Sequence, residues 1–302
     1  MQAAGTDLTV LRVFDAVVRH GGFAAAQAEL NIGASTISTH IRALEDRLGV
    51  KLCTRGREGF QLTEQGQIVL DAARRLFRGL DDFALDVGQL KSQMMGQLKI
   101  GLVDSIVTDP AMRLSLAIAR FKTVPNAVTI EITEDPPQVL QARVRSGDRH
   151  LGIGSFPHKI AGLRYELLYV ERHSLYCADH HPLFDAPDAR LSLRALRHEV
   201  IVSRGYWREE FVRNLGFENI GALVYQIEAQ LILVLSGAYL GFLPDHYAAP
   251  WVQAGRLRAL NPGSITYPCT FDLITQKDTA TPHMVSAFLR VLRDAQGVAA
   301  IP

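Results

Sequence analysis

Hydroxyl and guanidinium side chains crowd one short segment near the start of the chain. They are Ser35, Thr36, Ser38, Thr39 and Arg42. Serine and threonine hydroxyls can hydrogen-bond phosphate or base edges, and an arginine can reach guanine or phosphate. These residue types suit the recognition of duplex DNA, although an ordinary solvated helix face carries similar side chains.

A helix over residues 35–48 is predicted to position these side chains. Its apolar residues are spaced by four, three and four, so they share one buried stripe. The stripe consists of Ile37, Ile41, Leu44 and Leu48. An alanine-rich helix over residues 23–30 precedes it, and Gly33 lies in the intervening turn. Two short helices joined by a glycine turn are typical of a helix-turn-helix, whose second helix enters the major groove.

Two further cations occupy the turn of a predicted wing. Residues 50–63 are expected to form a short two-stranded hairpin whose turn holds Arg55 and Arg57, where protruding cations meet the DNA backbone or the minor groove. Residues 1–66 carry seven basic and seven acidic side chains, so total charge does not favour DNA. Binding must depend on local placement and on several copies acting together.

A long amphipathic helix follows the wing. Thr63 is a suitable cap for its first turn. Its apolar residues repeat by fours and threes for over 20 residues, a pattern typical of a coiled-coil seam that needs a partner helix. They are Ile68, Ala72, Leu76, Leu80, Phe83, Val87 and Leu90.

The remainder of the chain alternates strands with helices, which predicts an α/β fold with a parallel sheet. The segments YELLYV and HSLYCA are expected to be two separate strands within residues 165–178. The fold class is therefore multidomain α/β.

The run over residues 21–66 resembles the winged helix-turn-helix of LysR-type transcriptional regulators. The matching positions are Phe23, Ala25, Ala26, Leu30, Ser35, Thr36, Ile37, Ser38, Ile41, Leu44, Glu45, Leu48, Gly49, Leu52, Arg55, Leu62, Thr63 and Gly66. Three positions depart from the family pattern. They are Ala34, Cys53 and Glu58, and Ala34 removes an amide contact to a base that family members often make.

The resemblance extends over nearly the whole chain and implies its domain organisation. Residues 1–64 would bind double-stranded DNA, residues 65–93 would form a dimerising linker helix, and residues 94–302 would bind a small-molecule effector. The effector domain would resemble a periplasmic binding protein, with lobe I at about 94–164 and 269–302 and lobe II at about 165–268. Subunits would associate as a dimer of dimers, and RNA polymerase is a further candidate partner.

Effector contacts are expected at the ends of strands, where ligands of such α/β domains bind. The candidates are Ser105, Ser155, Phe156, Ser203 and Arg204, together with Asp104 beside Ser105. Each serine could hydrogen-bond a ligand or simply cap the next helix, and Arg204 could pair with a carboxylate.

Several other kinds of chemistry are not indicated. Cys177 lies near His173, His180 and His181, but surface-loop histidines explain these residues better than a metal site does, and no metal or cofactor is expected. Cys177 and Cys269 could form a redox switch, but reduced structural thiols are the default expectation for both residues.

The sequence shows no nucleophile elbow, phosphate-binding loop or zinc-protease motif, so an enzyme is not expected. A net charge of +1 excludes a basic coat, and the apolar runs are too short for a membrane span. We expect a cytoplasmic protein. Three alternatives remain. The protein could be a solute-binding module whose N-terminal helices only mediate assembly, an enzyme acting on a cleft ligand, or a DNA-binding protein without an effector.

Overall fold

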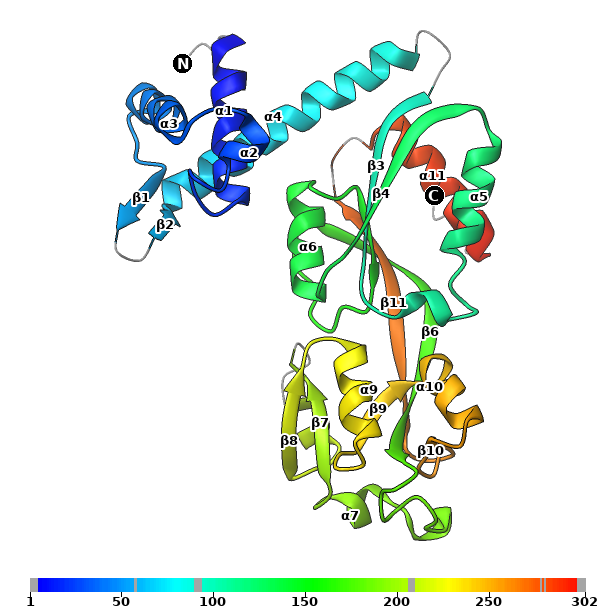
Figure 1. Ribbon diagram of the computed structural model, residues 1–302. Coiled ribbons are helices and arrows are strands. Elements are labelled where there is room, and N and C mark those ends of the chain that lie inside the picture. The colour runs from blue at the N-terminus through cyan, green and yellow to red at the C-terminus, as the bar shows by residue number, and fades with distance from the viewer. Residues whose placement is uncertain are drawn as a thin grey trace. The chain divides into compact units, whose positions relative to one another are not determined.

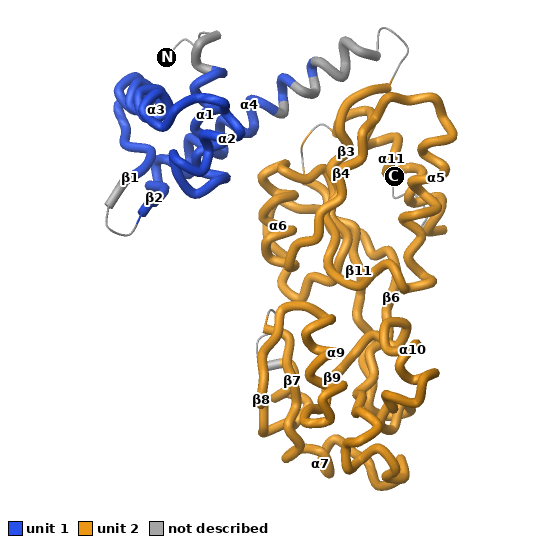
Figure 2. The backbone as a smooth tube through the Cα atoms, viewed as in Figure 1, with its two compact units in different colours: residues 1–86 blue, residues 87–302 orange. Residues whose placement is uncertain are grey.

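The computed structural model describes residues 5–56, 59–89, 94–205, 210–277, 279 and 281–297. The chain divides into two compact units, Met1–Asp86 and Val87–Pro302, which Figure 2 shows in different colours. Among the described helices, none combines the length and the apolar character needed to cross a membrane.

The first unit contains helices joined to a small hairpin (Figure 1). Its elements are α1 (Gly5–Arg19), α2 (Gln27–Leu30), α3 (Ala34–Leu48), β1 (Cys53–Gly56), β2 (Gly59–Leu62) and α4 (Glu64–Gln89). Phe14 of α1, Ile37 of α3 and Leu70 of α4 are buried in one core, which also includes Leu52 before the hairpin. The helices therefore pack around a single apolar centre, as the spacing of their apolar residues predicts.

The start of α4 is held against the chain before the hairpin. The Thr63 hydroxyl accepts a hydrogen bond from the Gly66 amide at 2.9 Å and donates to the Lys51 carbonyl at 2.6 Å, so Thr63 caps α4 as predicted. Gly66 lies so close to the preceding segment that a Cβ atom there would be 2.0 Å from the Leu52 carbonyl oxygen. A glycine is needed at this position because any side chain would push α4 away from the core.

The second unit has a larger set of elements. Its first half contains β3 (Met94–Leu102), η1 (Ile106–Thr108), α5 (Leu114–Thr123), β4 (Asn126–Glu134), α6 (Pro137–Ser146), β5 (Leu151–Gly154) and β6 (Leu163–Ala178). Its second half contains η2 (Asp188–Arg190), α7 (Leu193–Leu196), β7 (Val200–Arg204), α8 (Glu210–Asn214), β8 (Asn219–Val224), α9 (Ile227–Leu235), β9 (Gly241–Pro244), α10 (Asp245–Gln253), β10 (Leu257–Ala259), β11 (Thr266–Gln276) and α11 (His283–Gln296).

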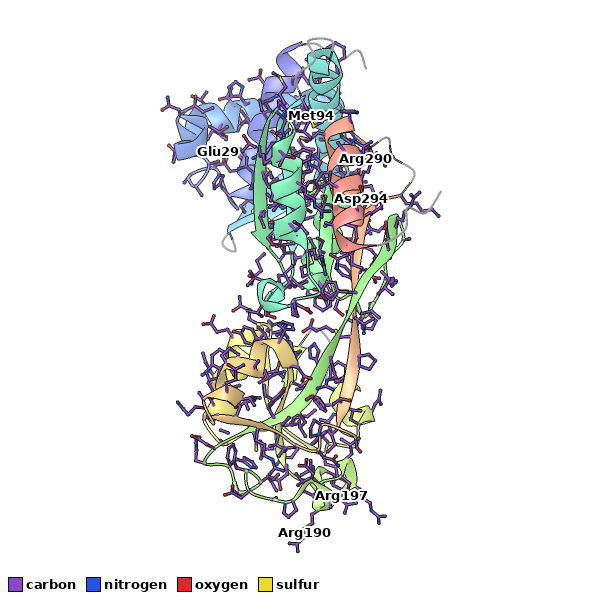
Figure 3. The ribbon with its side chains drawn as sticks, turned by 90° about the vertical axis from the view of Figure 1, so that its right-hand side faces the viewer. Glu29, Met94, Arg190, Arg197, Arg290 and Asp294 are labelled. Atoms are coloured by element: carbon purple, nitrogen blue, oxygen red, sulfur yellow. The ribbon has the colours of Figure 1, made fainter. Side chains whose placement is uncertain are left out.

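These elements form two lobes. In lobe I, β3 pairs in parallel with β4 and β5, while α6 covers one face of the sheet and α5 and α11 cover the other (Figure 1). In lobe II, β7 pairs in parallel with β8, and β9 and β10 both pair with β6. Figure 3 shows Arg190 and Arg197 at the end of lobe II that is farthest from α11, from which Arg290 and Asp294 project.

Two long strands, β6 and β11, run through both lobes. They pair antiparallel from Thr266 opposite Ser174 to Gln276 opposite Leu163, with one irregularity in register between Phe271 and Asp272. In lobe I, β11 also pairs antiparallel with β5. The lobes are therefore joined by a continuous hydrogen-bonded ribbon.

Two sequence predictions are wrong here. Residues 165–178 were expected to contain two strands, but they belong to one 16-residue strand, β6. The residues at positions 171–173 are polar, and they lie within this strand where it passes between the lobes. The sheet is also mixed rather than parallel, because β11 returns antiparallel between β5 and β6. The multidomain α/β fold class is confirmed.

We predict that Gly66→Ala destabilises the first unit by about 1–3 kcal/mol, because the new methyl group overlaps the Leu52 carbonyl. The matched control is Gly79→Ala in the same helix, where a Cβ atom would meet nothing within 4 Å. This control should stabilise the helix by about 0.5–1 kcal/mol. Thermal unfolding of both variants checks the prediction, and equal effects would contradict it.

Candidate functional site

The exposed face of α3 carries the polar residues that the sequence singled out. Ser35, Thr36, Thr39 and Arg42 are exposed and Ser38 is half-buried. The opposite face is buried in the core of the unit and consists of Ile37, Ile41 and Leu44. The hydroxyls and the guanidinium of α3 therefore point away from the unit that holds them.

The start of α3 is fixed by the preceding helix. The Gln27 side chain of α2 accepts a hydrogen bond from the Ala34 amide at 3.2 Å, and Gly33 stands at the N-cap position. Within α3, the Thr39 hydroxyl donates to the Ser35 carbonyl at 3.1 Å. This role of Gln27 was not predicted, since a lone glutamine in a short helix gives no sequence signal of capping.

The predicted wing is present as the antiparallel pair of β1 and β2, which runs from Cys53 opposite Leu62 to Gly56 opposite Gly59. Arg55 lies in β1 opposite Phe60, and its side chain is outside the described part of the structure. Arg57 also lies outside the described residues. The wing backbone thus follows α3 directly, as a winged helix-turn-helix requires.

Glu45 connects α3 to the chain that enters the wing. Its carboxylate accepts hydrogen bonds from the Leu52 amide at 2.8 Å, from the Cys53 amide at 3.4 Å and from the Lys51 ammonium at 2.7 Å. Burial alone would raise the pKa of the Glu45 carboxyl, but the hydrogen bonds from Lys51, Leu52 and Cys53 outweigh it and lower this pKa below 4.5. The buried carboxylate is therefore stable as an anion, and its hydrogen bonds hold the chain that enters the wing against α3.

One face of α4 is apolar and exposed. The exposed fractions are 63% for Ile68, 42% for Leu76, 36% for Leu80 and 65% for Phe83. The other face holds the helix to its own unit, where Arg74 pairs with Asp15 of α1 at 2.7 Å. The exposed face coincides with the seam that the sequence predicts. Val87 belongs to α4 but its side chain is not described, and Leu90 lies outside the described residues.

The second unit contains a small cavity between its two lobes. Its volume is about 40 Å³, and its walls include Ser105 and Ser155 from lobe I and Ser203 and Arg204 from lobe II. Four of the predicted strand-end residues therefore meet at one place. Phe156, the fifth, is buried and packs edge-on against Tyr165 at 5.9 Å without lining the cavity. A volume of this size holds only about three water molecules.

Arg204 pairs with a carboxylate of the protein itself. Its guanidinium donates to the two oxygens of Asp104 at 2.8 and 3.1 Å. Asp104 follows β3 in lobe I, and it also accepts a hydrogen bond from the Ile227 amide in the first turn of α9. Asp104 thus occupies an anion position formed by a guanidinium and a helix N-terminus, and it links the two lobes.

Among the described residues that line the cavity, two buried oxygen atoms have no hydrogen-bond partner. They are the Ser203 hydroxyl and the side-chain oxygen of Gln230, whose side-chain nitrogen donates to the Phe242 carbonyl at 2.9 Å. Both residues are only 2% exposed. Gln230 was missed by the sequence analysis, although a glutamine within the apolar segment of α9 is a recognisable signal. Such unpaired groups favour a ligand that supplies hydrogen bonds.

Cys177 and Cys269 are buried free thiols. Cys269 lies beside the cavity, where burial raises the pKa of its thiol to about 12 even though the thiol donates to the Ser155 hydroxyl at 3.2 Å. Burial also raises the pKa of the Cys177 thiol to about 11 in the core of lobe II. High thiol pKa values disfavour the reactive thiolate, so these residues fit the structural alternative.

Comparison with known proteins agrees with this arrangement. Residues 8–67 match the family model described as bacterial regulatory helix-turn-helix protein, lysR family, and residues 91–297 match the LysR substrate binding domain. The chain belongs to the LysR family of transcriptional regulators. This LysR-type regulator is therefore not an enzyme.

Individual relatives cover nearly the whole regulator. It is 34% identical over 293 residues to the HTH-type transcriptional activator BauR of Pseudomonas aeruginosa, with 96% of each chain covered. Its fold matches full-length CbnR complexed with target DNA at a TM-score of 0.62 and 21% identity, covering 95% of this chain and 99% of that one. It also matches full-length LysG of Corynebacterium glutamicum with bound effector Arg at a TM-score of 0.57 and 18% identity, covering 98% and 99%.

We predict that Glu45→Gln weakens the attachment of the wing by about 1–3 kcal/mol at pH 7, because a charge-assisted set of hydrogen bonds is lost. The lowered pKa of Glu45 means that its stabilisation is present above about pH 4.5 and is lost as the pH falls through the folded-state pKa. The difference between wild type and variant should therefore shrink toward pH 3.

Hydrogen exchange over residues 45–54, with both proteins compared at the same pH, measures this effect. The matched control is Asp46→Asn, which removes an exposed carboxylate from the next position of α3 and should leave protection unchanged. A difference that stays constant between pH 7 and pH 3 would show that the carboxylate charge is not responsible.

Proposed function

We propose that α3 reads the major groove of DNA and that the wing contacts the adjacent backbone or minor groove. The α3 contacts are Ser35, Thr36, Ser38, Thr39 and Arg42, and the wing contacts are Arg55 and Arg57. The observation that carries this proposal is the division of α3 into a buried apolar face and an outward polar face. The fold shared with CbnR, whose structure contains its target DNA, supports it.

The exposed apolar face of α4 is proposed to pack against α4 of a second subunit. Ile68, Leu76, Leu80 and Phe83 are all more than a third exposed and follow the spacing of a coiled-coil seam. Residues 1–64, 65–93 and 94–302 then act as the DNA-binding, linking and effector-binding parts. We further propose that effector domains join such dimers into a tetramer that works in the cytoplasm, with RNA polymerase as a candidate partner.

The cavity between the lobes is the proposed effector site, with Ser105, Ser155, Ser203 and Arg204 as contacts, whereas Phe156, the fifth predicted residue, does not line it. Because Asp104 already pairs with Arg204 in the wall of the cavity, an effector that bonds Arg204 must compete with this pair. Such an effector would shift the equilibrium between two arrangements of the lobes. The relative LysG, described with bound effector Arg, supports an effector in this fold.

We predict that Arg42→Ala and Arg55→Ala each weaken binding of the full-length regulator to the intergenic DNA upstream of its gene by about 5- to 100-fold. The matched control is Arg75→Ala, which removes an exposed arginine of α4 and should change affinity by less than about threefold. Mobility shift at one fixed salt concentration measures all of them. Unchanged binding by both variants would refute the proposed contacts.

We predict that Ser203→Ala leaves the unliganded Tm unchanged or higher, because it removes a buried unpaired hydroxyl. The same change should reduce the rise in Tm that a small carboxylate or aromatic effector produces in a thermal-shift screen. Ser236→Ala is the control, since its hydroxyl bonds the Leu233 carbonyl outside the cavity. A compound that stabilises Ser203→Ala and wild type equally does not contact Ser203.

A further inference from the structure

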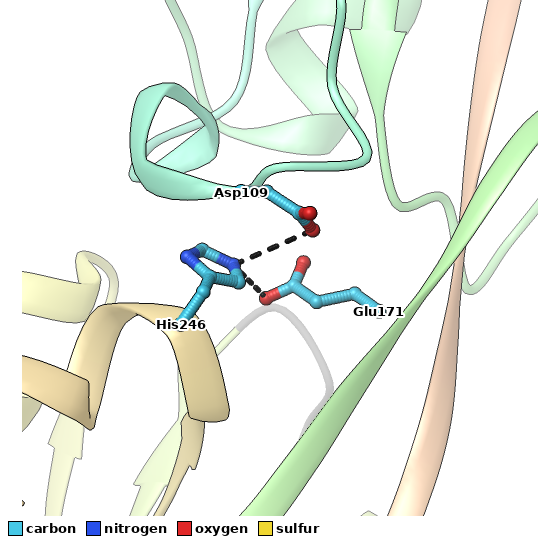
Figure 4. Close-up of side chains that lie close together, drawn as sticks. All are labelled: Asp109, Glu171 and His246. Carbon is cyan, nitrogen blue, oxygen red and sulfur yellow. Dashed lines mark hydrogen bonds and ion pairs between the residues drawn. The ribbon is translucent and has the colours of Figure 1, made fainter.

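Two carboxylates and an imidazole converge where the lobes meet, next to the effector cavity (Figure 4). Asp109 follows η1 in lobe I, Glu171 lies in the middle of β6, and His246 is in the first turn of α10 in lobe II. The His246 Nε2 atom is 3.0 Å from a Glu171 oxygen and 3.6 Å from an Asp109 oxygen. One donor atom from each of the three residues lies within 4.8 Å of the others.

All three side chains are withdrawn from solvent. The exposed fractions are 6% for Asp109, 4% for Glu171 and 11% for His246. Within the described residues, no lysine or arginine lies within ion-pair distance of either carboxylate, so imidazoles are their partners. Two buried carboxylates need compensating positive charge. A divalent cation held by two carboxylates and one neutral imidazole gives a site with no net charge.

The separations between the donor atoms suit a small cation. Bonds of 2.0–2.2 Å to nitrogen and oxygen in tetrahedral geometry place neighbouring ligand atoms about 3.3–3.5 Å apart. The observed 3.0 and 3.6 Å from His246 Nε2 lie on either side of this range, and the two carboxylate oxygens lie within 4.8 Å of each other, so side-chain movements are needed to complete the geometry. A mixed set of carboxylate and imidazole ligands suits first-row divalent metals such as Zn²⁺ and Mn²⁺ better than it suits calcium, which prefers oxygen ligands only.

Surrounding hydrogen bonds hold the three side chains in these orientations. The His246 Nδ1 atom is 2.7 Å from the Thr108 hydroxyl, which leaves Nε2 facing the carboxylates. One Asp109 oxygen accepts from the Ala111 amide at 2.7 Å, and His173 lies 3.2 Å from the Glu171 oxygen that faces His246. Outer contacts of this kind commonly orient metal ligands.

We propose that Asp109, Glu171 and His246 bind a first-row divalent cation, with Zn²⁺ as the probe. No metal was expected from the sequence, because the three residues are far apart along the chain. A cation here would bond Asp109 of lobe I and His246 of lobe II at once, and its ligand Glu171 also lines the effector cavity. Cation binding would therefore hold the lobes together and change the response to effector.

The test is titration of ZnCl₂ into the full-length regulator, prepared without a histidine tag and freed of metal by a chelator. Calorimetry should show one saturable site per chain, and Tm should rise to a plateau as that site fills. His246→Gln and Asp109→Asn should each lower the affinity at least 100-fold. Thr108→Val should lower it about 10- to 100-fold, because it removes only the orienting hydroxyl.

The matched control is His198→Gln, which removes an exposed imidazole of lobe II and should leave Zn²⁺ binding unchanged. Circular dichroism and the metal-free Tm show whether each variant is folded, and Asp109→Asn and Thr108→Val serve if His246→Gln is not. Absence of saturable binding by wild type, or undiminished binding by the folded variants, would overturn the proposal. These measurements contain no DNA, so they are independent of the proposed contacts of α3.

Discussion

In the DNA-binding unit, the burial of one face of each amphipathic helix determines which side chains the opposite face exposes. A helix can bury only one side against a small core, so the buried side determines what the other side presents. In α3 the buried residues Ile37, Ile41 and Leu44 leave a face of hydroxyls and one guanidinium. In α4 the packing against α1 leaves an apolar face. The exposed face of α3 is suited to nucleic acid and the exposed face of α4 to a second helix. Each exposed face is what remains after the opposite face of the helix is buried in the core.

In the effector unit, buried charged side chains link different parts of the fold. A carboxylate removed from water is costly unless it is paired, and the pairs here join different parts of the fold. Asp104 of lobe I pairs with Arg204 and with the first turn of α9 in lobe II. Glu171 pairs with histidines close to the same boundary. A ligand that enters between the lobes must therefore compete with internal charges.

Part of this structure could be predicted from local sequence pattern alone. The spacing of apolar residues in α3 predicts both the helix and its exposed face, since burial on one side leaves no other arrangement. The Thr63 cap of α4 is equally local. The meeting of Ser105 and Ser155 was predictable because the parallel strands β3 and β5 bring their ends to a common edge, and Ser203 and Arg204 lie at the corresponding end of β7 in the other lobe.

Long-range pairing was not predictable. Asp104 and Arg204 lie 100 residues apart, and nothing in either neighbourhood indicates the other. The polar residues at positions 171–173 resemble a turn unless the passage of β6 between two lobes is known. Phe156 follows a strand end like its neighbours, but its side chain packs on Tyr165. The residues that converge on His246 come from three separate segments, so only the folded chain brings them together.

The continuity of β6 and β11 sets the mechanical character of the effector unit. A flexible loop between lobes would let them swing freely, whereas two strands held edge to edge must bend and twist as one. The register of this pair shifts once, between Phe271 and Asp272, and an irregularity of this kind bends and twists a strand locally. The continuous pairing of β6 with β11 therefore favours small rotations of the lobes over wide opening.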